Sequence, residues 1–227
     1  MKTVLLTGAT GGIGKALVKE LGSLGYIIIA IDKDESELNK LNSEFNNIKS
    51  YIVADLSQAQ IIPILAKDLE SNYDHIDVLI NCAGVGIYND LENLTEAEWD
   101  LTFNVNIKAP FFLSQKLLPL LRKSEKPIIM NIGSEAGTRG RPGRSVYTAT
   151  KFAMRGFSLS LSQELKDITT TLITLGSVMT NFGKLNIDEK KELQKEGKKY
   201  LTPEEVAKRL VEILESDEIK EEYVLNP

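Results

Sequence analysis

The sequence predicts an α/β fold of three layers, in which a doubly wound parallel sheet forms a single domain over residues 1–227. Three observations predict it. Short apolar runs alternate with amphipathic stretches along the whole chain, and a glycine-rich turn follows the first run. No repeat, low-complexity tract or linker divides the chain, whose 227 residues suffice for one sizeable core.

The apolar runs are brief and rich in branched residues, which is typical of strands covered by helices on both faces. They are Val4–Leu6, Ile27–Ile31, Ser50–Val53, Val78–Ile80, Ile128–Ile132 and Thr171–Leu175. Amphipathic patterns predict helices over Ile13–Leu24, Glu35–Phe45, Ile61–Leu69 and Leu159–Leu165. Further helix starts are indicated by N-cap patterns: Asp34 with Glu37, Thr95 with Glu98, and Thr202 with Pro203 and Glu205.

Composition and charge argue against several classes of protein. A net charge of −5 and a pI near 5.2 disfavour a nucleic-acid binder, although backbone N–H groups can still hold an anionic cofactor. A single cysteine, Cys82, and a single histidine, His75, argue against a disulfide or a metal site. Because there is no signal-peptide pattern and no apolar window near the length of about 18 residues, we expect a cytoplasmic protein without a membrane partner.

The glycine-rich turn has the spacing Gly8-x-x-x-Gly12-x-Gly14, directly after the first predicted strand. Glycines let backbone approach a pyrophosphate, and the following helix offers N–H donors at its start. The spacing differs from the common G-x-G-x-x-G fingerprint, and a tight strand-to-helix loop is the alternative. Its place in a βαβ series favours dinucleotide binding.

Acidic and small residues follow the next strands. Asp32 can accept hydrogen bonds from the ribose hydroxyls of NAD and would repel a 2′-phosphate, whereas Lys33 beside it keeps NADP as an alternative. Asp55 can accept from the adenine amino group or cap the next helix. Ala83 and Gly84 let backbone lie against the nicotinamide side of a cofactor.

Tyr147 and Lys151 are four residues apart and share one face of a predicted helix. Lowering the pKa of a phenol from about 10 to about 7 requires about 4 kcal/mol. A cation about 4 Å away supplies on the order of 4 kcal/mol at an effective dielectric near 20. Ser134, just after a strand, can hold a substrate oxygen beside Tyr147 or simply serve the turn.

Together these segments resemble the short-chain dehydrogenase/reductase family over nearly the whole chain. Thr7–Gly14 matches its T-G-x-x-x-G-x-G motif, and Asn81–Gly84 matches N-N-A-G with Cys82 at the second Asn. Tyr147 to Lys151 matches Y-x-x-x-K, with Ser134 thirteen residues before it, and Asn106 matches a helix asparagine.

The resemblance implies a Rossmann-type fold and an NAD(P)-dependent oxidoreductase that interconverts an alcohol and a ketone or aldehyde. Tyr147 would transfer the proton, Lys151 would lower its pKa and bind the nicotinamide ribose, Ser134 would orient the substrate, and Asn106 would hold a water. Asp32 favours NAD, and Gly11 stands where NADP users carry a basic residue. The implied cofactor contacts are Gly8, Thr10, Gly12, Ile13, Gly14, Asp32, Lys33, Asp55, Leu56, Asn81, Ala83, Gly84, Tyr147, Lys151, Val178 and Thr180.

Two departures from the family pattern concern the end of the chain. Leu175-Gly176 replaces the family's Pro-Gly, which could loosen the substrate loop that holds Thr180. The last residues, Tyr223–Pro227, lack the family's glycine-rich tail and predict a short seventh strand. Because family tetramers often pack through that end, we expect a homodimer formed by helices that include Phe111–Leu121 and Phe152–Leu161, with a tetramer as the alternative.

The substrate is small, and the sequence does not name it. Residues 181–200 occupy the place of the family's substrate lid, but a solvated helix accounts more simply for their Lys and Glu residues. Arg139, Arg141 and Arg144 precede Tyr147; one of them could meet an acidic substrate group, although surface loops often carry arginines for solubility.

Two other functions compete with an enzyme of this kind. A non-catalytic NAD(P)-binding redox-sensing regulator would be expected to keep the glycine turn and lose the Ser/Tyr/Lys group, whereas this chain keeps both. A sugar-nucleotide epimerase would share Tyr and Lys but normally needs a larger substrate domain than this length allows.

Overall fold

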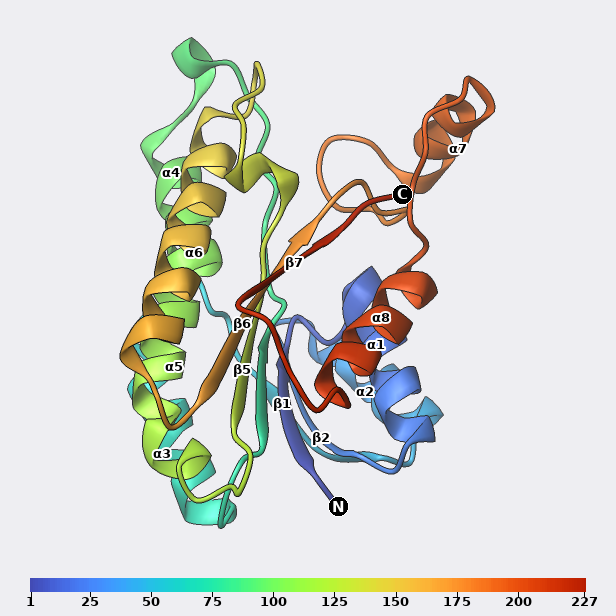
Figure 1. Cartoon of the computed structure of the whole chain (residues 1–227). Coiled ribbons are helices and arrows are strands. Elements are labelled where there is room, and N and C mark those ends of the chain that lie inside the picture. The colour runs from blue at the N-terminus through green and yellow to red at the C-terminus, as the bar shows by residue number, and fades with distance from the viewer.

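A computed structural model of residues 1–227 has one seven-stranded sheet between two layers of helices (Figure 1). The strand order is β3-β2-β1-β4-β5-β6-β7, and all neighbouring strands are parallel. The order reverses between β1 and β4, and open sheets of this kind bind ligands beyond the carboxyl ends of the strands at such a switch point. The predicted doubly wound α/β fold is confirmed.

The elements alternate along the chain as the sequence indicates. The strands are β1 (Thr3–Thr7), β2 (Ile27–Asp32), β3 (Ile48–Val53), β4 (Val78–Asn81), β5 (Ile128–Ile132), β6 (Thr169–Leu175) and β7 (Glu222–Leu225). The α-helices are α1 (Gly12–Ser23), α2 (Glu35–Glu44), α3 (Ile61–Asn72), α4 (Glu96–Phe103), α5 (Ala109–Leu121), α6 (Ser145–Glu164), α7 (Ile187–Lys195) and α8 (Pro203–Leu214). Shorter helical turns are η1 (Leu91–Asn93), η2 (Asn104–Lys108) and η3 (Glu135–Gly137).

Two apolar clusters hold the layers together, one on each face of the sheet. Successive strand side chains point to opposite faces, so in β1 Val4 and Leu6 belong to one cluster and Leu5 to the other. The first cluster includes Leu17 and lies under α1, α2 and α8; the second includes Leu113 and lies under α3 and α5, on the other side of the sheet in Figure 1. Covering both faces explains why the strands read as continuous apolar runs.

Several boundaries differ from the prediction. β3 begins at Ile48 and β6 at Thr169, each two residues earlier than the apolar runs indicate. The run of threonines that opens β6 is buried from Thr170 onward, so polar composition hid the start of a core strand. The predicted helix Leu159–Leu165 is the end of the 20-residue α6. β7 is short, with four residues, as expected.

None of the helices combines the length and the apolar character that crossing a membrane requires.

Candidate functional site

A cleft of about 1100 Å³ opens at the carboxyl ends of the strands, around the switch point. It is lined by residues from the β1–α1 turn, the ends of β2 to β6, α6 and the segment that leads into α7. All the predicted site residues except Asn81 and Asn106 line it: Gly8, Thr10, Gly12, Ile13, Gly14, Asp32, Lys33, Asp55, Leu56, Ala83, Gly84, Ser134, Tyr147, Lys151, Val178 and Thr180.

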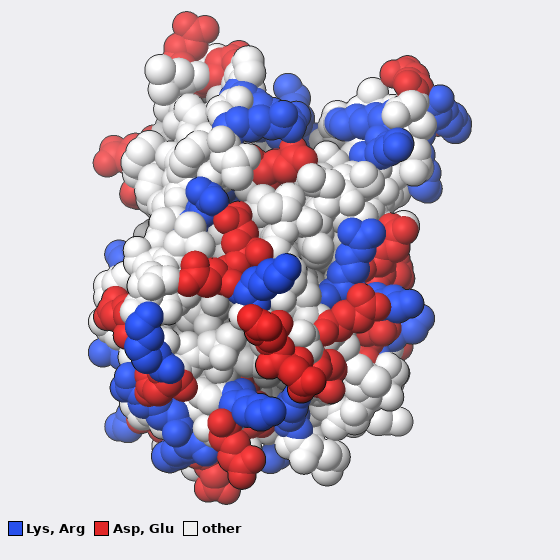
Figure 2. Space-filling view, viewed as in Figure 1, with Lys and Arg blue, Asp and Glu red and all other residues white.

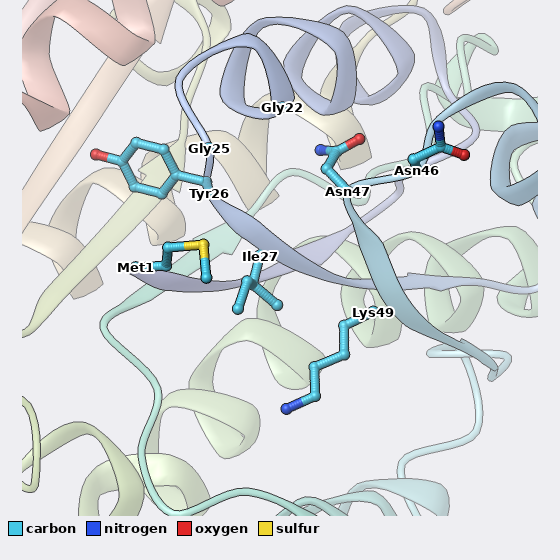
Figure 3. A pocket seen from close by; sticks show the side chains of 8 residues that line it. All are labelled: Met1, Gly22, Gly25, Tyr26, Ile27, Asn46, Asn47 and Lys49. Carbon is cyan, nitrogen blue, oxygen red and sulfur yellow. The ribbon is translucent and has the colours of Figure 1, made fainter.

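A second, smaller hollow of about 570 Å³ lies at the opposite, amino edge of the sheet (Figure 3). Met1, Tyr26 and Lys49 line it, at the starts of β1, β2 and β3. No predicted site residue is found there. The cleft at the carboxyl edge is therefore the candidate active site.

The β1–α1 turn lies directly against the segment that follows β4. The Thr7 hydroxyl joins the two, because it accepts the N–H groups of Cys82 and Ala83 at 3.1 Å each. Gly8 has a φ of +71°, and a Cβ there would lie 2.8 Å from the Cα of Ala83. A Cβ on Gly14 would lie 2.1 Å from the Gly8 carbonyl oxygen. The close approach of the two segments thus requires glycine at Gly8, and the tightness of the turn itself requires it at Gly14.

The start of α1 fits a pyrophosphate. Its N-cap, Gly11, makes no side-chain hydrogen bond to the first turn. By contrast, α2, α4, α7 and α8 are all capped by a side chain that accepts a backbone N–H group. The first N–H groups of α1, which lines the cleft, therefore keep their capacity to bind an anion.

Asp32 is held firmly at the end of β2. One carboxylate oxygen accepts the Thr10 N–H at 3.0 Å, and the other accepts the Lys33 N–H at 2.8 Å. Asp55, at the next strand, accepts the Ser57 N–H at 3.0 Å, which holds the pKa of Asp55 below its usual value. The charge of Lys33 lowers that pKa further, so this lysine acts on Asp55. Two carboxylates thus line this end of the cleft and are able to accept hydrogen bonds from a ligand.

Tyr147 and Lys151 lie on α6 at the other end of the cleft, and both are buried. The Lys151 Nζ is 5.8 Å from the centre of the Tyr147 ring and donates a hydrogen bond to the Ile132 carbonyl at 2.9 Å. Burial raises the pKa of Tyr147, and Tyr88 raises it further. Burial lowers the pKa of Lys151 to about 8.

The expected lowering of the Tyr147 pKa by Lys151 is therefore wrong for the protein chain alone. The four-residue spacing correctly placed the two side chains together, but it does not report burial, which opposes the charged form of both groups. The influences that do lower the pKa of Tyr147 are a hydrogen bond with Ser134 and the charge of Arg144. Ser134 also caps η3 by accepting the Ala136 N–H at 3.2 Å, so it serves the turn while it contacts Tyr147.

The two asparagines lie behind the cleft. The Asn81 amide donates to Asn131 at 2.8 Å and to Ser114 at 3.3 Å in a fully buried network. Asn106 lies in the π-helical turn η2, and its side chain pairs with both backbone groups of Val85 at 2.8 and 2.9 Å. Turns of this type occur often at functional sites. Both residues hold the wall of the cleft, and a direct cofactor contact by the Asn81 side chain does not fit its position.

Sequence reasoning missed the aromatic surroundings of Tyr147. The rings of Tyr88 and Phe182 lie 5.4 Å and 5.8 Å from the Tyr147 ring. The guanidinium carbon of Arg144 lies 4.5 Å over the Tyr88 ring. Tyr88 and Phe182 belong to loops after β4 and β6 that carry no motif at these positions. The sequence could have indicated Tyr88 and Phe182 through their positions in loops that follow strands whose carboxyl ends meet at the cleft.

The segment 181–200 contains α7, which lies outside the two helix layers (Figure 1). Most of its charged side chains are exposed, as a solvated helix requires. Lys190 is an exception, since it is buried and donates to the carbonyls of Val178, Thr180 and Phe182 at 3.3, 2.6 and 3.0 Å. Its stem and ammonium tie α7 to the edge of the cleft.

The fold and the glycine turn define a dinucleotide-binding α/β protein. The family model for short chain dehydrogenase matches residues 2–191. The chain therefore belongs to the short-chain dehydrogenase/reductase family, whose members are NAD(P)-binding oxidoreductases that act on small molecules.

Individual relatives share the sequence and the fold. The chain is 34% identical over 197 residues to nodulation protein G of Rhizobium sp., covering 84% of this chain and 79% of that protein. It is 30% identical over 192 residues to the 3-oxoacyl-[acyl-carrier-protein] reductase of Haemophilus influenzae, with the same coverage.

Solved structures of dehydrogenases share the fold of this chain. An alcohol dehydrogenase of Thermococcus sibiricus in complex with 5-hydroxy-NADP is similar with a TM-score of 0.88 and 26% identity, over 99% of this chain and 96% of that one. A closed form of serine dehydrogenase with NADP⁺ gives a TM-score of 0.87 and 26% identity over 98% and 94%.

Proposed function

We propose that the protein is an NAD-dependent oxidoreductase that interconverts an alcohol and a ketone or aldehyde, with Tyr147 as the general acid/base. The observation that carries this proposal is the burial of Tyr147 and Lys151 on one face of α6, in the same cleft that Asp32 lines. A proton-transfer group and a cofactor-binding carboxylate at two ends of one cleft suit hydride transfer between a dinucleotide and a substrate.

NAD is the proposed cofactor. The N–H groups at the start of α1 would hold its pyrophosphate, and Asp32 would accept the hydrogen bonds of the adenosine ribose. Both oxygens of Asp32 accept backbone N–H groups, which hold the carboxylate at the end of β2. A carboxylate beside the adenosine ribose would repel the 2′-phosphate of NADP. When bound, NAD⁺ supplies the hydride acceptor and a positive charge beside Tyr147. The similarity to structures that contain NADP does not decide the preference of this chain.

Tyr147 would move the proton. Its raised pKa keeps the phenol protonated at neutral pH, so it is ready to donate to a carbonyl oxygen in the direction of reduction. Ser134 would hold the same oxygen, and Lys151 would hold the nicotinamide ribose and add positive charge to the site. Asn106 would keep its predicted place on the path by which Lys151 exchanges protons with solvent.

The assembly and location belong to the same proposal. We place the enzyme in the cytoplasm, in line with its unpaired Cys82. We propose a homodimer formed through α5 and α6, because Phe111 and Phe152 expose 43% and 47% of their surface there.

The test combines cofactor binding with catalysis. Fluorescence titration should give at least tenfold tighter binding of NADH than of NADPH, and a panel of small ketones and aldehydes should then oxidise NADH. Tyr147→Phe should bind NADH as the wild type does and lose about 10²- to 10⁴-fold in kcat. Tyr51→Phe, on β3 and outside the cleft, is the matched control. Wild-type turnover by Tyr147→Phe would refute the acid/base assignment, and a preference for NADPH would refute that of Asp32.

A further inference from the structure

We propose that Arg144 forms a subsite for the carboxylate of the substrate, so that the enzyme acts on a short hydroxy acid or the corresponding oxo acid. This inference rests on the proposed function and adds the chemical class of the substrate. It follows from the position of the guanidinium, from its lack of a protein partner, and from the pairing of the neighbouring arginines.

Arg144 is fixed beside the proton-transfer group. It precedes α6 as its N-cap residue, and its carbonyl accepts the Thr148 N–H at 2.8 Å. Its guanidinium lies 4.5 Å over the face of Tyr88, whose ring meets Tyr147 edge-on at 5.4 Å. A guanidinium stacked on an aromatic face leaves the N–H groups at its edge free to bind a planar anion. All three side chains line the cleft.

Arg144 alone among the three arginines of this segment is unpaired. Arg139 and Arg141 both bind Glu135, at 2.8 and 3.2 Å. Arg144 forms no ion pair and donates no side-chain hydrogen bond, although it is only half-exposed. Asp90 also lines the cleft, but it is exposed and is not paired with any arginine or lysine. A half-buried cation without a carboxylate is ready to bind one from a ligand.

Basic side chains outnumber acidic ones around the substrate end of the cleft, where Arg141, Arg144, Lys184 and Lys198 line it together with Asp90 and Glu135. Figure 2 shows Lys and Arg side chains on both sides of the notch between the upper ends of α4 and α6 and α7, with an acidic group in the notch between them. Lys184 and Lys198 line the cleft from the α7 side. The influence of Arg144 reaches Tyr147, since it lowers the pKa of that phenol. One short ligand can therefore place its carboxylate at Arg144 and its hydroxyl at Tyr147, provided that only a few bonds separate the two groups.

The reaction leaves the carboxylate unchanged. In oxidation, the carbon that bears the hydroxyl gives a hydride to NAD⁺, and the hydroxyl gives its proton to Tyr147, so that a hydroxy acid becomes an oxo acid. In reduction, NADH supplies the hydride and Tyr147 supplies the proton. Arg144 only binds and orients, because a guanidinium offers N–H donors and has no acceptor atom.

Binding tests the subsite without catalysis. Ligand-observed NMR with the NAD⁺-saturated enzyme would compare saturated carboxylates, from acetate to hexanoate, with their amides. At least one carboxylate should bind tenfold tighter than its amide. Arg144→Gln should raise the Kd of that carboxylate about 10- to 100-fold and leave the Kd of the amide unchanged. Arg139→Gln, which removes an exposed arginine paired with Glu135, should change neither. Equal binding of all acids and amides, or an equal loss in Arg139→Gln, would overturn the proposal.

Turnover separates this proposal from the proposed function. With NAD⁺, 2-, 3- and 4-hydroxybutyrate would be compared with their methyl esters, and kcat/KM for the preferred acid should fall in Arg144→Gln while that of its ester does not. If Arg144→Gln oxidises the hydroxy acids as well as the wild type does, the carboxylate subsite fails and the enzyme stands. If carboxylates bind through Arg144 but Tyr147→Phe is fully active, the acid/base assignment fails and the subsite stands. Weaker NADH binding by Arg144→Gln would assign the guanidinium to the cofactor and overturn the subsite.

Discussion

Lys151 occupies an unfavourable place for a charged side chain. It is buried behind Tyr147, and its ammonium has one protein acceptor, the Ile132 carbonyl. Its pKa falls from 10.5 to about 8, which means that folding disfavours its charged form. Sites that hold such a charge for catalysis commonly do so at the expense of stability.

This destabilisation depends on pH. Below about pH 8 Lys151 is charged in both the folded and the unfolded protein, and burial of the charged ammonium destabilises the folded state to its full extent. Between about pH 8 and 10.5 the unfolded chain binds more protons, so stability rises with pH. Relative to Lys151→Met, the wild type should gain up to about 3 kcal/mol of unfolding free energy across this window, since one pKa unit is about 1.4 kcal/mol. Urea denaturation of both proteins at pH 7.5 and pH 10.5 measures the gain, and a constant difference would contradict the assignment.

At the scale of residues, sequence spacing predicted which side chains lie close together but not how deeply they are buried. The pair Tyr147 and Lys151 was identified from four-residue spacing, and Asp32 from its distance past the glycines. The direction of the Tyr147 pKa was not predictable, because it is set by burial under Tyr88 and Phe182, which come from distant loops. Arg144 could be named as one of three candidates, and it is distinguished by its stacking on Tyr88 and by the pairing of Arg139 and Arg141 with Glu135.

At the scale of elements, a buried lysine attaches α7 to the edge of the cleft. Lys190 donates to the three carbonyls of Val178, Thr180 and Phe182. Val178 also pairs with Leu201 in an isolated parallel bridge, so the two ends of the segment around α7 meet at the same place. On this arrangement we propose that residues 181–200 form the substrate lid that the family resemblance implies, with Lys190 as its anchor.

Removing the anchor should loosen the lid without unfolding the domain. In Lys190→Met, three carbonyls lose their charged donor, and the local opening free energy of residues 178–200 should fall by about 1–3 kcal/mol. Hydrogen–deuterium exchange should therefore speed up there by about 5- to 150-fold and stay unchanged in β1 and β4. Lys191→Met, which removes an exposed lysine paired with Asp188, is the control. Equal exchange in both variants would show that Lys190 does not hold the segment.

Strands were predicted correctly from the sequence where their residues are apolar as well as buried. Apolar runs identified six of the strands, because both faces of the sheet are covered. The early start of β6 was missed because threonines form it, and the π-helical turn η2 was missed because its sequence has no distinct pattern. The burial of Lys190 could not be predicted either, because it stands beside charged residues such as Lys191 and Glu192, which are exposed. The sequence pattern does not distinguish it from them.

At the scale of the whole molecule, an apolar surface on α5 and α6 predicts self-association. The Phe111 ring lies 5.2 Å from that of Phe112 and 5.1 Å from that of Phe157, and Phe152 is a further exposed aromatic residue on α6. Clustered exposed aromatic side chains are typical of an interface. Light scattering should give the mass of two 25.2-kDa chains for the wild type and of one chain for Phe111→Glu/Phe152→Glu. Leu24→Glu, an exposed site after α1, should stay dimeric, and a monomeric wild type would end the proposal.

The packing of α1 against α8 also bears on how the protein is made. These two helices lie side by side on one face of the sheet (Figure 1), although α1 ends at Ser23 and α8 begins at Pro203. During synthesis, the apolar face of α1 has no α8 to cover it until most of the chain has left the ribosome. Domains that depend on such distant contacts fold slowly and expose apolar surface meanwhile. The nascent chain is thus a natural client for chaperones that shield apolar segments until translation reaches α8.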